Sequence, residues 1–347
     1  MKRSWLVGIA AAIVLLGIAA AIAFANRAAI RSFYDTISGQ DYTGDGICCV
    51  TVVIDKGDAG DAIANKLQVA GAIKSASVFY RLVLAENPVF YPGTYSVNKS
   101  ASSGFVLEQL LSEENLIMTR VTIKEGLRLG QTLKVLSEST GLPISEFEAA
   151  ARDLDALGIP SAAVNADGYL FPATYEFDPN ESASQILQTM VRRTFQELNN
   201  FDVPIADRHR VLTFASIVQK EARLTEDFFK VARVFQNRLD IGMMLQSDAT
   251  VSYGSGGTTV TTTDEERAAK NGYNTYVRSG LPIGPIAGAG ALAIDAVLHP
   301  ADGDWLFFCA VNLKTGETVF SVTGAEHARA VEQWQAWMRA NPGWNGD

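Results

Sequence analysis

The sequence predicts an α+β protein made of an N-terminal transmembrane helix, a small mixed domain and a larger, mainly helical domain. Residues 5–25 form an uninterrupted apolar run, residues 48–125 alternate strand-like and helix-like segments, and residues 126–347 show mostly helical apolar spacing. A chain of 347 residues, 48% of them hydrophobic, is long enough to form two such domains. We therefore expect an anchor over 1–26, a polar tether over 27–47, and domains over 48–125 and 126–347.

The apolar run over residues 5–25 has the length of a membrane-spanning helix. At 1.5 Å per residue, about twenty residues cross the roughly 30 Å hydrocarbon core of a bilayer. A cleaved signal peptide is the alternative, because small residues at the end of the run resemble a cleavage site. Lys2 and Arg3 precede the run and Arg27 and Arg31 follow it, so positive charge hardly decides the orientation.

Apolar spacing and turn residues divide the small domain into short elements. β-branched residues favour a strand at its start, and a Pro-Gly turn introduces a second strand. The expected order is a strand over 49–54, helices over 58–69 and 75–84, a strand over 92–97, a helix over 105–111 and a strand over 119–123.

The large domain reads as a series of helices followed by a β-hairpin. Thr225 with Glu226 and Asp227 is typical of the N-cap and acidic first turn of a helix. Residues 153–166, which contain Gly158 and small residues, predict an interdomain connection. The expected elements are helices over 129–139, 144–151, 183–198, 207–222, 225–239 and 289–298, strands over 305–311 and 318–322, and a closing helix over 324–339.

Glu221 is the anomalous residue of the expected helix over 207–222. It lies within about 20–60° of Phe214, Ile217 and Val218 around the helix axis, so its carboxyl group points along the apolar face. Removal from water and the negative end of the helix dipole both raise the pKa of a carboxyl group. A glutamic acid that stays protonated near neutral pH can act as a general acid toward a glycosidic oxygen.

A structural role for Glu221 is the alternative. Most helical glutamates are solvated or ion-paired, and Lys220 and Arg223 are the neighbouring cations. Periodicity alone therefore leaves both interpretations open.

Five motifs that begin with this helix occur in a fixed order. They are ASIVQKE at 215–221, VFQNRL at 234–239, MLQSDATVSYG at 244–254, YNTY at 273–276 and GLPIGPI at 280–286. In order and spacing they resemble the YceG-like family of endolytic murein transglycosylases. The segments DGYLFPATY at 167–175 and 320–327 extend the resemblance over most of the chain after residue 50.

The resemblance implies that Glu221 is the family's catalytic glutamate and that the reaction is lytic. Glu221 would protonate the leaving glycosidic oxygen and then, as a carboxylate, take the proton from the MurNAc C6 hydroxyl as it attacks C1. No second carboxylate is needed, because no water has to be activated. Many members read Glu-Lys-Glu where this chain has Gln219-Lys220-Glu221. We assign the catalytic position to Glu221, because Gln219 lies about 200° away on the helix and is not an acid.

The resemblance also implies a fold for each domain. The segment 48–125 is expected to be a LysM-like subdomain that binds glycan, with an ordinary α+β packing domain as the alternative. The segment 126–347 is expected to be a lysozyme-like catalytic domain, mainly helical, with a supporting β-hairpin.

Candidate substrate-binding residues lie in Gly/Thr/Ser-rich sequence after the catalytic helix. Polar side chains on loops held by helices can recognise sugar hydroxyl and N-acetyl groups, whereas local turn and cap hydrogen bonds are the alternative. The candidates are Gln246, Ser247, Asp248, Asn274 and Tyr276. Tyr169, in an aromatic strip with Phe171 and Tyr175, either stacks on a sugar ring or belongs to the core.

Composition argues against several other classes of function. The net charge of −9 argues against a nucleic-acid partner. The three histidines are far apart in sequence and show no metal-ligand spacing, so we expect no metal and no cofactor. Cys48, Cys49 and Cys309 give no paired framework, and adjacent cysteines are poorly placed to bridge each other.

The predicted function is endolytic cleavage of MurNAc-β-1,4-GlcNAc bonds within nascent peptidoglycan strands. The products would carry 1,6-anhydroMurNAc ends, and glycan elongation would end. One alternative is a non-catalytic glycan-binding or scaffold protein of the cell-wall machinery, because Gln219 departs from the Glu-Lys-Glu sequence of many family members. The other alternative is a muramidase that uses water as the nucleophile. The resemblance implies a single-pass protein of the cytoplasmic membrane with its catalytic domain on the periplasmic, extracytoplasmic side. Peptidoglycan strands are the expected partner, and peptidoglycan synthases are candidate partners.

Overall fold

The computed structural model describes residues 40–257 and 262–342. They form two compact units: one ends at Thr119 and includes Asp178–Asn180, and the other contains Arg120–Phe177 and the residues from Glu181 onward. No helix in the described residues is long and apolar enough to cross a membrane. The apolar run over 5–25 lies outside the described residues, so the expected anchor remains a prediction.

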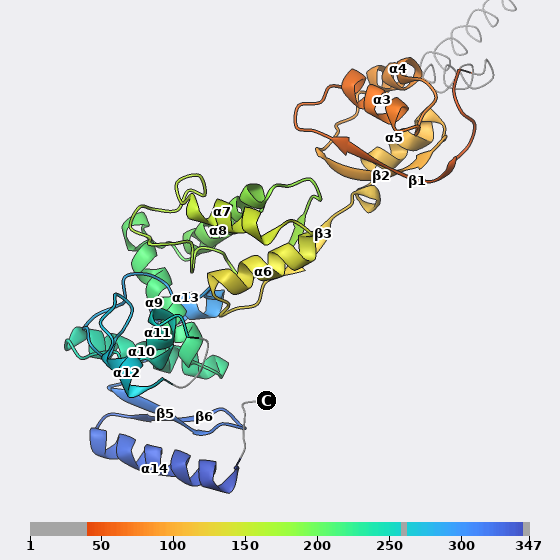
Figure 1. The fold of residues 1–347 in the computed structure, drawn as a ribbon. Coiled ribbons are helices and arrows are strands. Elements are labelled where there is room, and N and C mark those ends of the chain that lie inside the picture. The colour runs from red at the N-terminus through yellow and green to blue at the C-terminus, as the bar shows by residue number, and fades with distance from the viewer. Residues whose placement is uncertain (1–39, 258–261, 343–347) are drawn as a thin grey trace, which may run out of the picture. The chain divides into compact units, whose positions relative to one another are not determined.

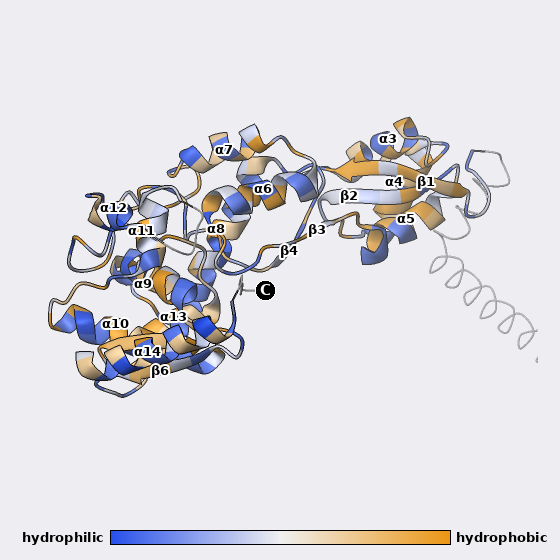
Figure 2. Cartoon of the chain, turned by 60° about the horizontal axis from the view of Figure 1, so that its bottom comes forward, coloured by the Kyte–Doolittle hydropathy of each residue, from blue (hydrophilic) through white to orange (hydrophobic). Residues whose placement is uncertain are grey.

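The first unit packs helices around a two-stranded antiparallel sheet (Figure 1). In this sheet Val52 lies opposite Tyr95, and Figure 2 shows that the first strand is hydrophobic over most of its length. The elements are β1 (Ile47–Ile54), α3 (Gly60–Val69), α4 (Ala76–Glu86), β2 (Gly93–Lys99), α5 (Ser103–Leu111) and a 3₁₀ turn over Glu113–Asn115. The fully buried side chains at its centre include Ile63, Leu67, Phe79 and Val97.

The first unit also holds a short piece of chain from far downstream. The Thr94 N–H donates a hydrogen bond to Asp178 Oδ2 at 2.6 Å, and the Thr94 hydroxyl donates to Asp178 Oδ1 at 2.7 Å. This is why the boundary between the units is crossed three times by the chain.

The second unit begins with a small sheet and three helices around a shared core. Its first elements are β3 (Thr119–Thr122), α6 (Leu129–Thr140), α7 (Ile144–Arg152), β4 (Thr174–Phe177) and α8 (Ala183–Asn200). β3 pairs with β4, and α7 packs against α8. The apolar faces of these elements join one hydrophobic core with the helices that follow.

The remainder of the second unit surrounds a buried helix, α9 (Arg208–Glu221). It packs against α10 (Thr225–Asp240), α11 (Asp248–Gly254) and α13 (Ala291–Leu298), and α12 (Asp264–Ala268) packs against α11. The chain ends with an antiparallel hairpin, β5 (Phe307–Asn312) and β6 (Glu317–Ser321), against which α14 (Gly324–Ala340) packs (Figure 1). The mixed helices and small sheets confirm the α+β class.

Each helix and strand expected within residues 40–257 and 262–342 is present, with ends within about two residues of the prediction. β4, α11 and α12 were not expected. All three are short, and the sequence around α11 and α12 is rich in Gly, Ser and Thr, which obscures helical periodicity.

Two expectations about the described residues are wrong. Residues 153–166 do not connect domains, because Leu157 and Ile159 are buried in the core of the second unit. Cys48 and Cys49, which we expected not to bridge, form a disulfide at the start of β1, and the peptide bond between them is cis. Cys309 is a free thiol.

Candidate active site

Glu221 is the last residue of α9 and lies at the edge of the core. Every residue from Val211 to Val218 is buried, whereas Glu221 is half-buried and lines a cavity of about 720 Å³. The side chain therefore points in the direction that the apolar face of the helix predicted. The cavity also gives a substrate access to the carboxyl group.

The surroundings of Glu221 favour its protonated form. Removal from water raises the pKa of the carboxyl group, and the negative charge of nearby Asp248 acts in the same direction. Two hydrogen bonds oppose this, because the Ser247 hydroxyl donates to Glu221 Oε1 at 2.5 Å and the Ala249 N–H also donates to the carboxyl group. The net effect is a raised pKa, so Glu221 keeps its proton to higher pH than an exposed glutamate, as a general acid requires.

One wall of this cavity is polar and comes from the segment between α10 and α13. Four of the six predicted substrate-binding residues line it together with Glu221, namely Gln246, Ser247, Asp248 and Tyr276. Arg267 of α12 completes this wall.

Asp248, the first residue of α11, is held on several sides. Its Oδ1 accepts hydrogen bonds from the Tyr276 hydroxyl at 3.0 Å and from the Thr262 hydroxyl at 2.6 Å. Arg267 Nε forms an ion pair with the same oxygen at 3.2 Å. With these partners Asp248 fixes the loop beside Glu221 and supplies the negative charge that raises the Glu221 pKa.

Gln246 occupies a left-handed backbone conformation, with φ of 52°, and its side chain is exposed. A residue other than glycine pays about 1 kcal/mol or more for this conformation. The Gln246 N–H donates to the Thr275 carbonyl at 3.1 Å, which holds the strained turn in place. The turn directs the side chain of Gln246 to the cavity lining.

Asn274 does not line the cavity, in contrast to its predicted contact with sugar. It is 0% exposed, and its amide nitrogen donates to the carbonyl oxygens of Glu266, Arg267 and Ala269 at 2.7–3.1 Å. Its side-chain oxygen accepts from the Tyr276 N–H at 2.9 Å. A saturated, buried amide has no group left for a ligand, so Asn274 holds the loop that carries the cavity residues.

Tyr169 also lies away from the cavity, so its stacking on a sugar is not supported. It is 0% exposed, and its hydroxyl forms a hydrogen bond of 2.8 Å with His209 Nδ1. Phe171 and Tyr175 of the same strip are buried as well. The core alternative therefore describes these three aromatic residues.

Gln219 lies on another side of α9 and does not line the cavity. Its side-chain oxygen accepts a hydrogen bond from the Gly290 N–H at 3.0 Å, immediately before α13. This contact gives Gln219 a structural role that needs an acceptor oxygen and no acid.

Arg238 of α10 is a cavity residue that the sequence analysis did not single out. It is 8% exposed, and its guanidinium donates to the carbonyl oxygens of Leu306 at 2.6 Å and Leu245 at 2.7 Å. Like Glu221, it is a charged residue on the buried face of its helix, near the positions of Val231 and Val234. The criterion that identified Glu221 could therefore have identified Arg238.

A second part of the cavity lining is largely apolar and was also missed. It is formed by β5 and α14, and its residues include Phe307, Phe308, His327, Val331 and Trp334. The apolar pattern of these elements was visible in the sequence, but periodicity does not distinguish a core-facing side chain from one that faces a cavity.

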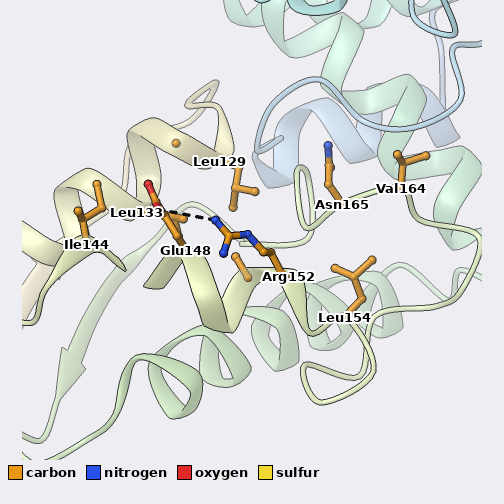
Figure 3. Close-up of a pocket in the computed structure, with 10 residues that line it drawn as sticks. Leu129, Leu133, Ile144, Glu148, Arg152, Leu154, Val164 and Asn165 are labelled. Atoms are coloured by element: carbon orange, nitrogen blue, oxygen red, sulfur yellow. Dashed lines mark ion pairs between the residues drawn. The ribbon is translucent and has the colours of Figure 1, made fainter. Parts of the chain in front are cut away.

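A second cavity of about 450 Å³ lies at α6 and α7 (Figure 3). It is lined mostly by apolar side chains such as Leu129, Leu133 and Ile144. Its carboxylate, Glu148, is half exposed and lies 3.9 Å from Arg152 in an ion pair. It lacks an enclosed acid, so the Glu221 cavity is the better candidate for catalysis. Among residues 40–257 and 262–342, no group of three or more His, Cys, Asp or Glu side chains could hold a metal ion.

Known proteins are similar to this chain over most of its length. The model of the YceG-like family matches residues 52–333. The chain is 31% identical over 311 residues to the endolytic murein transglycosylase of Bacillus subtilis strain 168, covering 84% of this chain and 86% of that protein. It is 27% identical to the endolytic murein transglycosylase of Streptococcus pneumoniae strain D39, covering 82% of this chain but only 58% of that protein.

A solved structure is similar as well. The crystal structure of a putative YceG-like protein from Listeria monocytogenes superposes with a TM-score of 0.54 at 29% sequence identity. The match covers 81% of this chain and 98% of that one.

Proposed function

The chain belongs to the YceG-like family, and from this membership and the enclosed carboxyl group of Glu221 we infer that it is an endolytic murein transglycosylase. It cleaves MurNAc-β-1,4-GlcNAc bonds within peptidoglycan strands and leaves 1,6-anhydroMurNAc ends. The observation that carries this proposal is the position of Glu221 at the end of the buried helix α9, where its carboxyl group lines a cavity large enough for sugar rings.

In the proposed reaction Glu221 acts first as an acid and then as a base. Its proton goes to the glycosidic oxygen as the bond from that oxygen to C1 of MurNAc breaks. The Glu221 carboxylate then takes the proton of the C6 hydroxyl, whose oxygen forms the new bond to C1. The Ser247 hydroxyl, which donates to Glu221 Oε1, stabilises the carboxylate between the two steps.

Asp248 is not a second catalytic acid in this proposal. Its carboxylate is engaged by Arg267, Thr262 and Tyr276, so it is poorly suited to activate a water molecule. A hydrolytic glycosidase of the usual kind needs a second carboxylate for the nucleophile or its activation. Among the described residues that line the cavity, Glu221 is therefore the one available carboxyl group, which favours the lytic route over a muramidase.

We also propose a location and further interactions for the rest of the chain. The apolar run over 5–25 is proposed as a single-pass anchor in the cytoplasmic membrane, with the following domains on the periplasmic or extracytoplasmic side. The first unit is proposed to be a LysM-like module that binds glycan, and the second unit a lysozyme-like catalytic domain. The cleavage would end elongation of nascent strands, so peptidoglycan synthases are proposed partners.

The test is the mass of the products that the purified protein makes from uncross-linked glycan strands. A lytic enzyme gives internal cleavage and new anhydro ends, which are one water lighter than hydrolysed ends. New ends that carry the added water would show a muramidase. Binding of strands without new ends would show a non-catalytic glycan-binding protein.

A further inference from the structure

The Glu221 cavity has two walls of different chemistry. The polar wall carries Gln246, Ser247 and Asp248, and the wall formed by β5 and α14 carries aromatic and aliphatic side chains. A pyranose ring has the same asymmetry, because its hydroxyl and N-acetyl groups lie around the edge whereas its faces expose C–H groups. The second wall is therefore suited to the face of a sugar ring.

The α14 part of this wall is a single stripe on the helix surface. His327, Val331 and Trp334 are spaced by four and three residues, which places them on one face. The start of α14 is fixed by a capping box, in which Thr323 Oγ1 accepts from the Glu326 N–H at 3.3 Å and Glu326 accepts from the Thr323 N–H. The capping box fixes where α14 begins, and the packing of α14 against β5 and β6 holds the stripe at the cavity.

Phe307 of β5 contacts both His327 of this stripe and the buried guanidinium of Arg238. Its ring stacks on His327 with centroids 5.1 Å apart and planes 19° apart, and the Arg238 guanidinium lies 5.2 Å from the same ring. Burial lowers the pKa of His327, and the positive charge of Arg238 lowers it further. His327 therefore presents an uncharged ring to the cavity at neutral pH, and a flat, uncharged surface is suited to stacking.

We propose that Trp334 and His327, the latter backed by the ring of Phe307, form a sugar-binding subsite that stacks on the face of an N-acetylhexosamine ring in the glycan strand. The proposal rests on the proposed function, because it assigns a substrate contact within the same cavity. Trp334 is the half-buried tryptophan of the wall and provides the largest flat surface. It contributes to substrate binding and does not take part in proton transfer.

The test is the steady-state kinetics of the full-length Trp334→Ala variant on uncross-linked glycan strands. Loss of one aromatic contact is expected to raise KM about 3- to 10-fold, with kcat changed less than about twofold because Glu221 is unaffected. Trp334→Phe should recover most of the binding. Affinity for the same strands, measured in a Glu221→Gln background that does not turn over, should fall by a similar factor.

The matched control is Trp337→Ala, on the same helix but outside the cavity lining, which should leave KM unchanged. If Trp334→Ala lowers the melting temperature, Trp334→Leu keeps apolar volume but removes the flat ring, and KM should still rise. An unchanged KM in both Trp334 variants overturns the subsite while leaving the proposed function in place. Absence of new anhydro ends from the wild-type protein would overturn the proposed function itself.

Discussion

The Ser247 hydroxyl donates a hydrogen bond of 2.5 Å to Glu221 Oε1. This bond opposes the effect of burial, because it stabilises the ionised carboxylate, whereas removal from water and the charge of Asp248 favour the protonated acid. A residue that both gives and takes a proton needs both influences. Because these effects oppose each other, Glu221 can be protonated for the first step of the proposed reaction and ionised for the second.

We expect Ser247→Ala to shift the pH dependence of the reaction upward. The variant loses a hydrogen bond that lowers the Glu221 pKa, so Glu221 keeps its proton to higher pH and the alkaline limb of kcat/KM moves to higher pH. The measurement is the pH profile of anhydro-end formation. Ser255→Ala, at an exposed position outside the cavity, is the matched control. A profile that moves to lower pH would contradict the stated role of Ser247.

We expect Asn274→Ala to destabilise the fold. The substitution removes the fully buried Asn274 amide, which leaves three backbone carbonyl oxygens and the Tyr276 N–H without this partner, at a cost of about 2–4 kcal/mol. Thermal unfolding should show a lower melting temperature. Gln246→Ala, at an exposed position, should reduce turnover with little change in melting temperature. Equal melting temperatures for Asn274→Ala and the wild type would show that Asn274 is not the structural residue described here.

The sequence predicted Glu221 and the neighbouring polar wall for physical reasons that are local. A helix has a fixed period, so one charged residue on its apolar face is visible without a structure. Ser247 and Asp248 follow in motif sequence that reaches the same cavity. The longer helices and strands were predictable because their apolar residues recur with a clear period. The short helices α11 and α12 contain too few residues to show such a period, so they were missed.

The rest of the site depends on tertiary contacts that no local pattern contains. Asn274 and Tyr169 have the polarity and aromaticity of ligand contacts, yet internal hydrogen bonds allow both to be fully buried. His327 and Trp334 lie about a hundred residues beyond Glu221 in sequence, and only the packing of α14 against the β5–β6 hairpin places them in its cavity. Their position in the cavity lining was therefore not predictable from the sequence.

We expect Asp167 to make the stability of the second unit pH-dependent. Burial raises its pKa from 3.8 to about 6, although its carboxylate accepts bonds from the Tyr253 hydroxyl and the Leu129 N–H at 2.8 Å each. A folded-state pKa above the unfolded value favours folding at low pH, so its contribution is complete below about pH 4 and is lost as pH rises through about 6. The loss is at most about 3 kcal/mol.

The measurement is the free energy of unfolding between pH 4 and pH 7. Relative to the wild type, Asp167→Asn should remove this decrease with rising pH, even if its lost hydrogen bond lowers stability at every pH. Asp155→Asn, at an exposed position, should retain the wild-type dependence. Parallel curves for the wild type and Asp167→Asn would contradict the assignment.

We expect the domains to lie outside the cytoplasm. A reporter fused after Asp347 that works only in the extracytoplasmic space should be active, and a reporter that works only in the cytoplasm should be silent. The reason is the apolar run over 5–25, which is long enough to span a bilayer and is followed by both units. Activity of the cytoplasmic reporter at this position would overturn the proposed topology.

Formation of anhydro ends by the Glu221→Gln variant tests the central claim most directly. Glutamine keeps the size of the side chain but cannot deliver a proton, so anhydro-end formation should fall by at least about 10²–10⁴-fold while folding and glycan binding are retained. Gln219→Glu is the matched control, because a carboxylate can still accept the hydrogen bond from the Gly290 N–H outside the cavity, and its activity should match the wild type. Wild-type turnover by Glu221→Gln, or activity that appears only in Gln219→Glu, would contradict the assignment of Glu221 as the proton donor.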